Sequence, residues 1–195
     1  KLLRDGKPAR FLERKPEEER AFRMLGLLSS KPVLYVCNVE ESAAANGNGF
    51  SQAVFDHAKK EGAVAVVISA KIESEIATLS RAERVDFLET LELEEAGLDR
   101  LIRAGYELLH LITYFTVGPK EARAWTITKG TKAPAAAGVI HTDFEKGFIR
   151  AETIAFDDYV TLNGEAGARD AGKLRLEGKE YVVADGDVMH FRFNN

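Results

Sequence analysis

Two short polar segments carry side chains suited to holding a flat, hydrogen-bonding ligand. The first, residues 38–41 (Asn-Val-Glu-Glu), follows the apolar run 33–37, and the second, residues 69–71 (Ser-Ala-Lys), follows the apolar run 63–68. An Asn side chain offers one acceptor and two donors, so it can pair with both a ring nitrogen and an amino group of a purine. These few residues also fit a second interpretation, an Asn at a strand end followed later by a simple Ser-Ala-Lys turn.

The elements around these segments would bring them together. Short continuous apolar runs are typical of strands that are buried on both faces of a sheet. Residues 50–61, between the two runs, have helical spacing. Strand, helix and strand in this order predict a parallel pair in an α/β sheet. Both polar segments then lie on the carboxyl edge of that sheet, where open α/β sheets bind their ligands.

Helical patterns flank the two predicted strands. Pro16 and the three glutamates after it favour a helix start, and Phe22, Leu25 and Leu28 have the spacing of an apolar helix face. Beyond the second strand the apolar spacing is again helical, and the last helix should carry its apolar face as far as Ile112. These later helices are expected at residues 72–79, 81–91 and 97–112.

The sequence changes in character near residue 113, where we place a domain boundary. From Tyr114 onward, short β-like runs are separated by Gly, Pro and Asp, which predicts a small mixed sheet with one short helix near residues 142–147. The runs expected to form strands are 122–128, 139–141, 149–156, 181–184 and 188–193.

Four conspicuous side chains are interpreted structurally. Cys37 lies inside a predicted buried strand, where a free Cys usually acts as a small hydrophobic residue. Trp125 is expected in the core of the small sheet. His141 and Asp143 could suggest acid–base chemistry, but no nucleophile or second base accompanies them. A helix start capped by Thr142 or Asp143 is the interpretation we prefer.

Composition and charge narrow the class of protein. The chain has 195 residues, 45% of them hydrophobic, and a net charge of −4. Residues 1–31, 32–112 and 113–195 carry net charges of +4, −7 and −1, so no strongly basic stripe indicates nucleic acid. Cys37 is the single cysteine, which excludes an internal disulfide framework and fits a reducing compartment. No apolar run approaches the length of a membrane span, so we expect a cytoplasmic protein without membrane or DNA partners.

The two polar segments resemble the base-recognition loops of P-loop GTPases, which read Asn-Lys-x-Asp and Ser-Ala-Lys. Here Val39 replaces the Lys, and Glu41 replaces the Asp that pairs with guanine. An Asn-x-x-Glu loop is the mark of the YchF/Obg-like family, whose members prefer ATP or accept both purine nucleotides. The resemblance therefore implies that ATP binds at least as well as GTP. It places the nucleotide-binding site on Asn38, Val39, Glu41, Ser69, Ala70 and Lys71.

The second half of the chain strengthens this resemblance. Residues 119–127 and 141–152 look like the TGS domain that ends members of the family, a ubiquitin-like β-grasp module that contacts RNA or protein. The implied fold class is α/β. Residues 1–31 would end a helical insertion, 32–112 would form part of a Ras-like P-loop NTPase sheet, and 113–195 would form the TGS domain. The implied function is a ribosome-associated ATPase or GTPase that acts as a slow regulatory switch, contacting the large ribosomal subunit, ribosomal RNA or another protein complex.

The phosphate-binding part of such an enzyme is not recognisable in the sequence. Residues 167–173 have the GxxxxGK spacing, but Leu174 stands where a hydroxyl residue is needed to bind magnesium, and no long helical pattern follows. We interpret this segment as a Gly-rich connection. The chain begins with Lys1, and we expect the phosphate loop and the Mg²⁺ ligands for ATP or GTP upstream of it, so that this chain alone would be inactive.

Two other functions compete with the switch ATPase. The chain could be a TGS binding module whose remaining sheet has no useful nucleotide affinity, which a binding titration would reveal. It could also be part of a TGS-bearing synthetase, which is disfavoured because the two loops precede the TGS segment in the order found in GTPases.

Overall fold

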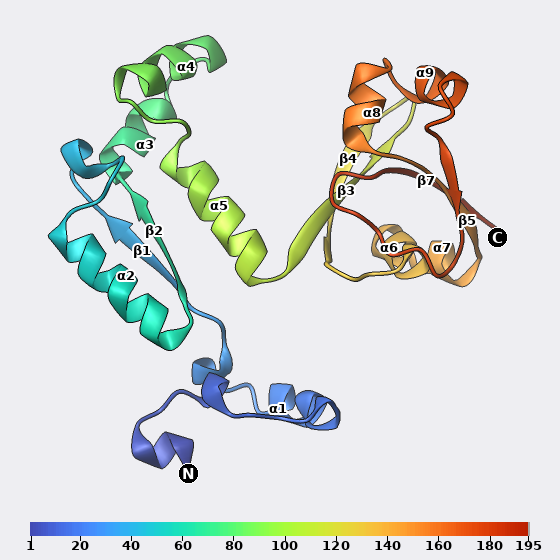
Figure 1. Ribbon diagram of the computed structural model, residues 1–195. Helices are drawn as coiled ribbons and strands as arrows, with labels where there is room; N and C mark the ends of the chain where they lie inside the picture. Colours follow the sequence, from blue (N-terminus) through green and yellow to red (C-terminus); the bar gives the residue numbers. More distant parts are fainter. Residues whose placement is uncertain (195) are drawn as a thin grey trace. The chain divides into compact units, whose positions relative to one another are not determined.

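The computed structural model describes residues 1–194 and divides the chain into two compact units (Figure 1). The first unit is Lys1–Leu108, and the second begins at Leu109. Each unit has its own cluster of buried apolar side chains. The division falls at the end of a helix, a few residues before the boundary expected near residue 113.

The N-terminal segment of the first unit consists of short helical turns. They are η1 (Leu2–Asp5), η2 (Ala9–Phe11), η3 (Pro16–Glu18), α1 (Glu19–Met24) and η4 (Leu28–Ser30). The helix predicted to start at Pro16 does so, as a 3-10 turn that continues into α1. Its expected apolar face is only partly confirmed, because Phe22 is buried whereas Leu25 and Leu28 are 64% and 88% exposed. The chain leaves the helix before these two leucines can join Phe22 on one face.

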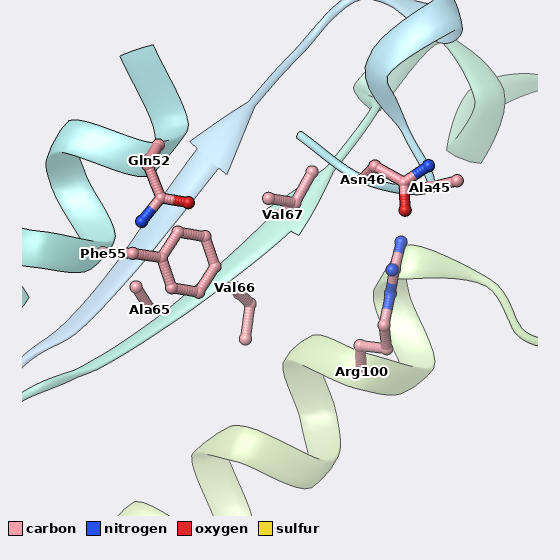
Figure 2. A pocket seen from close by; sticks show the side chains of 8 residues that line it. All are labelled: Ala45, Asn46, Gln52, Phe55, Ala65, Val66, Val67 and Arg100. Atoms are coloured by element: carbon pink, nitrogen blue, oxygen red, sulfur yellow. The ribbon is translucent and has the colours of Figure 1, made fainter. Parts of the chain in front are cut away.

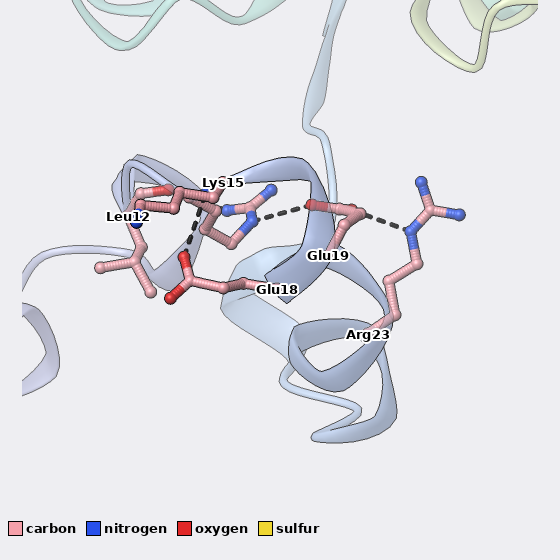
Figure 3. Close-up of polar contacts among 6 residues, drawn as sticks. Leu12, Lys15, Glu18, Glu19 and Arg23 are labelled. Atoms are coloured by element: carbon pink, nitrogen blue, oxygen red, sulfur yellow. Dashed lines mark hydrogen bonds and ion pairs between the residues drawn. The ribbon is translucent and has the colours of Figure 1, made fainter.

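Polar contacts hold this segment together (Figure 3). The Glu19 carboxylate pairs with Arg14 at 2.9 Å and with Arg23 at 2.8 Å, while the backbone N–H of Lys15 donates to Glu18. The hydrogen bonds from Arg23 and Arg14 lower the pKa of Glu19. The Arg14 guanidinium also lies 4.0 Å from the centre of the Phe22 ring. Charged side chains therefore cover the single buried aromatic residue of α1.

The predicted parallel pair of strands is confirmed. Strands β1 (Leu34–Asn38) and β2 (Val64–Ile68) pair in parallel, with Leu34 opposite Val64 and Asn38 opposite Ile68. Helix α2 (Gly49–Glu61) connects them, and the Asn48 side chain caps its first turn by accepting from two backbone N–H groups. Because the register aligns the last residues of both strands, the loops after Asn38 and Ile68 leave the sheet at the same edge.

Contrary to expectation, the two strands are not buried on both faces within residues 1–194. Among their residues Val67 is buried, but most others, Cys37 included, are only half-buried, and Val36 is 44% exposed. Each strand has a neighbour on one side, and helices α2 and α5 cover the two-stranded sheet incompletely. The apolar runs 33–37 and 63–68 predict the two strands correctly, but the strands are less buried in this chain than such runs usually are.

Helices α3 (Ala70–Ile76), α4 (Arg81–Thr90) and α5 (Gly97–Leu108) follow the sheet. They enclose the apolar cluster of the first unit, which contains Ala44, Ile72, Ile76, Leu93 and Ala96. The helix expected to continue to Ile112 ends at Leu108, because His110 adopts a left-handed φ of 53° and the next residues enter a strand. The β-branched and aromatic residues after Leu111 favour that strand over further helix.

The second unit is a five-stranded mixed sheet with the order β4-β3-β7-β5-β6. Strand β3 (Leu111–Val117) pairs antiparallel with β4 (Ala122–Thr128). On its other side, β3 pairs parallel with β7 (Val188–Phe193). Strand β5 (Phe148–Ile154) lies between β7 and β6 (Arg175–Glu177) and is antiparallel to both. A mixed sheet with two parallel central strands from opposite ends of the unit is the β-grasp arrangement implied by the resemblance. The α/β fold class is confirmed.

Helices α6 (Ala133–Ile140) and α7 (Thr142–Lys146) pack on one face of this sheet, and α8 (Phe156–Thr161) and α9 (Glu165–Asp170) follow β5. The strand predicted at 139–141 is wrong, because these residues finish the Ala-rich helix α6. The run 181–184 forms no strand and contributes one isolated bridge, Val182 opposite Lys132. The helix near 142–147 is confirmed, but the expectation of one helix in this unit is wrong, because α6, α8 and α9 are helical as well. None of the helices within residues 1–194 is long and apolar enough to cross a membrane.

Candidate functional site

The structure brings together the two loops predicted to form a site. The backbone N–H of Val39 donates to the carbonyl oxygen of Ile68 at 2.9 Å, which extends the parallel ladder past the end of β1. The Asn38 side-chain oxygen Oδ1 then accepts the backbone N–H of Ala70 at 2.9 Å. This bond fixes the orientation of the Asn38 amide. The two N–H donors of its Nδ2 group are left out of this bond and have no partner among residues 1–194.

A second contact crosses between the same loops. Lys71 Nζ lies 2.6 Å from Glu41 Oε2, and both side chains remain partly open to solvent, at 66% and 42% exposure. The hydrogen bond that Lys71 donates to Glu41, together with the charge of that carboxylate, raises the pKa of Lys71. The carboxylate that stands at the Asp position of the GTPase loop is therefore paired with an ammonium group.

Ser69 forms the buried base of the second loop. It is 2% exposed, and its carbonyl oxygen accepts the N–H of Glu73 at 3.0 Å at the start of α3. Its hydroxyl oxygen Oγ is buried and has no hydrogen-bond partner among the described residues. Ala70 and Lys71, by contrast, are exposed. The loop is anchored at Ser69 and presents its next two residues outward.

Two supporting contacts were missed by the sequence analysis. Asn48 Nδ2 donates to Glu40 at 3.2 Å and closes the loop that follows β1. Glu73 accepts the backbone N–H groups of Gly97 and Leu98 at 2.7 and 3.2 Å, which ties the start of α5 to α3. The sequence does signal the position of Asn48, because an Asn three residues before a Ser is a recognisable helix-capping pattern. The contact from Glu73 to Gly97 joins residues 24 apart, so no local pattern in the sequence could have predicted it.

A hollow of about 380 Å³ lies beside the site, along β2 between α2 and α5 (Figure 2). Phe55 and the strand residues form its apolar wall, and the Arg100 side chain reaches toward it from α5. Arg100 Nη2 donates to the carbonyl oxygen of Ala44 at 3.3 Å. None of the six predicted site residues lines this hollow. Its lining residues are Ala45, Asn46, Gln52, Phe55, Ala65, Val66, Val67 and Arg100.

The segment with phosphate-loop spacing has another structure. Most of residues 167–173 belongs to α9 and the turn after it, and the short strand β6 follows instead of a long helix. Gly167 is required by packing, since a Cβ there would lie 1.9 Å from the carbonyl oxygen of Leu162. The segment was expected to be a connection, but the first part is helical because Glu165 and Arg169 support a short helix with an i,i+4 ion pair.

The remaining candidates are structural. His141 itself caps α7, with Nδ1 accepting the N–H of Asp143 at 3.2 Å, so the predicted cap on Thr142 or Asp143 is one or two residues too late. An imidazole nitrogen can accept like the usual capping oxygens. Trp125 packs partly buried against the core of the second unit and donates from Nε1 to Thr116.

Comparison with known proteins shows the family to which the chain belongs. The family model YchF-GTPase_C, described as "Protein of unknown function (DUF933)", matches residues 111–194. The chain is 56% identical over 190 residues to the "Ribosome-binding ATPase YchF" of Bacillus subtilis (strain 168), covering 96% of this chain and 52% of that protein. It is 43% identical over 171 residues to "Obg-like ATPase 1" of Rattus norvegicus, covering 86% and 43%. The chain belongs to the YchF/Obg-like family.

Solved structures support the same assignment. The Schizosaccharomyces pombe YchF GTPase superposes with a TM-score of 0.83 at 35% identity, covering 97% of this chain and 50% of that one. A GTP binding protein from Pyrococcus horikoshii OT3 shares the fold, with a TM-score of 0.60 at 19% identity, over 99% of this chain and 55% of that one. The chain thus corresponds to the C-terminal portion of YchF proteins and spans about half the length of the relatives it matches.

Proposed function

We propose that this chain supplies the base-reading loops and the C-terminal contact domain of a ribosome-associated, purine-nucleotide-binding NTPase of the YchF type. The observation that carries the proposal is the Asn38–Ala70 hydrogen bond at the carboxyl edge of the parallel pair β1–β2. It orients an amide with two free donors at the place where open α/β sheets bind ligands. Relatives named as ribosome-binding ATPases support the same function.

In this proposal each loop residue has a defined part. Asn38 Nδ2 donates to a ring nitrogen of the purine, because its Oδ1 is already engaged by Ala70. Val39 is half-buried and packs against a face of the base. The backbone from Ser69 to Lys71 closes the opposite side. The six predicted residues thus form one base pocket, with Ser69 supporting it from within.

The second unit supplies the contact surface in the complete protein. Its β-grasp sheet has a self-contained core, so it can present its outer residues without rearranging. We propose that this TGS-like unit contacts the large ribosomal subunit, ribosomal RNA or another protein assembly, in the cytoplasm. ATP or GTP would bind with Mg²⁺ and be hydrolysed slowly as a regulatory switch. Within residues 1–194, no three His, Cys, Asp or Glu side chains lie close enough together to hold a metal ion.

A second candidate function is a binding module without useful nucleotide affinity. The GxxxxGK spacing at residues 167–173 favours it, because this segment folds as the end of α9 and a turn instead of a phosphate loop. Titration of the complete protein with ATP separates the two functions. Saturable binding supports the switch NTPase, and its absence supports the binding module.

The test of the base site is substitution of Asn38 in the complete protein, followed by calorimetric titration with ATP. Asn38→Asp keeps an acceptor for the Ala70 N–H but removes both Nδ2 donors. Asn38→Ala removes the acceptor as well as the donors. Both should weaken binding by about 1–3 kcal/mol, the cost of leaving a buried polar edge of the ligand unpaired. Asn46→Ala, an exposed Asn beside the neighbouring hollow, should leave the affinity unchanged. Unchanged affinity in both Asn38 variants would refute the assignment.

A further inference from the structure

The ion pair between Lys71 and Glu41 joins the two base loops at the residue expected to read guanine. Its two charged atoms, Nζ and Oε2, are 2.6 Å apart. We propose that Lys71 determines base specificity: by pairing with Glu41 it withdraws the carboxylate that would otherwise favour guanine over adenine. This inference rests on the proposed base site, in which the Ser-Ala-Lys resemblance places Lys71 without giving it a part in the choice of base.

The chemistry of the two bases explains why the pairing matters. Guanine presents a ring N–H and an amino group side by side, and a free carboxylate accepts hydrogen bonds from both. Adenine presents a ring nitrogen acceptor at the same edge, whose lone pair an uncompensated carboxylate repels. When an ammonium group neutralises the carboxylate, its attraction for the guanine donors and its repulsion of the adenine ring nitrogen both become weaker. The Lys71–Glu41 pair therefore moves the preference toward ATP.

The backbones of both partners are anchored, so the pair is set by the fold. Glu41 begins the turn η5 (Glu41–Ala43), and Ala43 at its end is 7% exposed. Lys71 directly precedes Ile72, which is 1% exposed in the core of the first unit. The Asn38–Ala70 hydrogen bond fixes the separation of the loops one residue before Lys71. Only the ends of the two charged side chains are free to respond to a ligand.

Other charges near the pair act in the same direction. Glu75, one helical turn after Lys71 in α3, also raises the pKa of Lys71, although less than Glu41 does. Glu40 is engaged by the Asn48 side chain and does not compete. Lys71 therefore stays charged, and Glu41 is the carboxylate to which it donates.

The test compares the affinities for Mg·ATP and Mg·GTP in the complete protein by calorimetry. Lys71→Met keeps the length of the side chain and removes its charge, and it should shift the ATP-to-GTP affinity ratio toward GTP by roughly two- to fivefold, the range expected for an exposed ion pair. Lys71→Arg preserves the pair and should keep the wild-type ratio. Glu41→Gln added to Lys71→Met should abolish the shift, because no carboxylate remains to reach guanine.

A matched control is Arg103→Met, which breaks the exposed Arg103–Glu95 ion pair of α5 and should leave the ratio unchanged. An unchanged ratio in Lys71→Met, in a protein that binds ATP normally, would overturn this inference and leave the proposed function intact. A shift that persists in the double variant would also overturn it. A complete wild-type protein that binds neither nucleotide would instead refute the proposed function itself.

Discussion

The two units use their sheets in different ways. In the second unit the sheet is the centre of the core, where Tyr114, Ala151 and Met189 are each exposed by 2% or less. In the first unit the most deeply buried side chain is Ile72 of α3, at 1%, while Val36 in the middle of β1 is 44% exposed. Within this chain, packing on the two-stranded sheet does little to hold the loops at its edge. Here the loops after β1 and β2 are joined by the cross-loop contacts of Asn38 and Glu41.

The largest expected effect lies in the sheet of the second unit. Phe191 is 7% exposed and contacts the rings of Tyr114 and Phe148. Phe191→Ala should lower the free energy of unfolding of this unit by about 3–5 kcal/mol, through lost burial and the cavity left behind. Chemical denaturation followed by the fluorescence of Trp125, the single tryptophan, reports on this unit. A loss below about 1 kcal/mol would show that the sheet is not its stability centre.

A smaller change in the free energy of unfolding, an increase instead of a decrease, is expected from a substitution at Thr153 in β5. This residue is fully buried, yet its hydroxyl oxygen Oγ1 has no hydrogen-bond partner within residues 1–194. Thr153→Val replaces the hydroxyl with a methyl group of similar size and should raise the free energy of unfolding by about 1 kcal/mol. Thr153→Ser keeps the hydroxyl and should destabilise. Denaturation midpoints of the two variants falling on the same side of wild type would contradict this account.

The smallest effect should come from the sheet of the first unit. In this chain of 195 residues, Val36→Ala removes apolar atoms that are already half in water, so the free energy of unfolding should fall by less than about 0.5 kcal/mol. Circular dichroism during urea denaturation measures it. A cost as large as that of Phe191→Ala would mean that β1 is covered as completely as β7, and the comparison between the two sheets would fail.

Much of the fold could be predicted because its signals are local. The apolar runs at 33–37 and 63–68, separated by helical spacing, predict the parallel pair and the common edge of the two loops. Strands β4 and β7 match their predicted bounds. The predictions were wrong where contacts with neighbouring elements decide the structure against the local sequence pattern. Leu111 and Ile112 continue an apolar helical spacing but pair with β4, and Val139 is β-branched but lies in the last turn of an Ala-rich helix.

The candidate site was predictable in its position but not in its detail. Asn38 and Lys71 follow predicted strands, so the sequence places them at one sheet edge. Their partners could not be predicted, because the bond to Ala70 joins residues 32 apart and the pair with Glu41 joins residues 30 apart. Such contacts depend on the register of β1 against β2. The role of the six residues in nucleotide binding stays a prediction.

We propose that these loops read a purine without selecting guanine. The most direct test of this proposal is the ratio of ATP to GTP affinity in the complete protein, measured by calorimetry with Mg²⁺ present. Since Glu41 is longer than the Asp of GTPases and is paired with Lys71, ATP should bind at least as well as GTP. Replacing Glu41 with Asp and Val39 with Lys should shift the preference toward GTP. Binding of GTP about a hundredfold tighter than ATP, a difference of roughly 2.7 kcal/mol, would contradict the account.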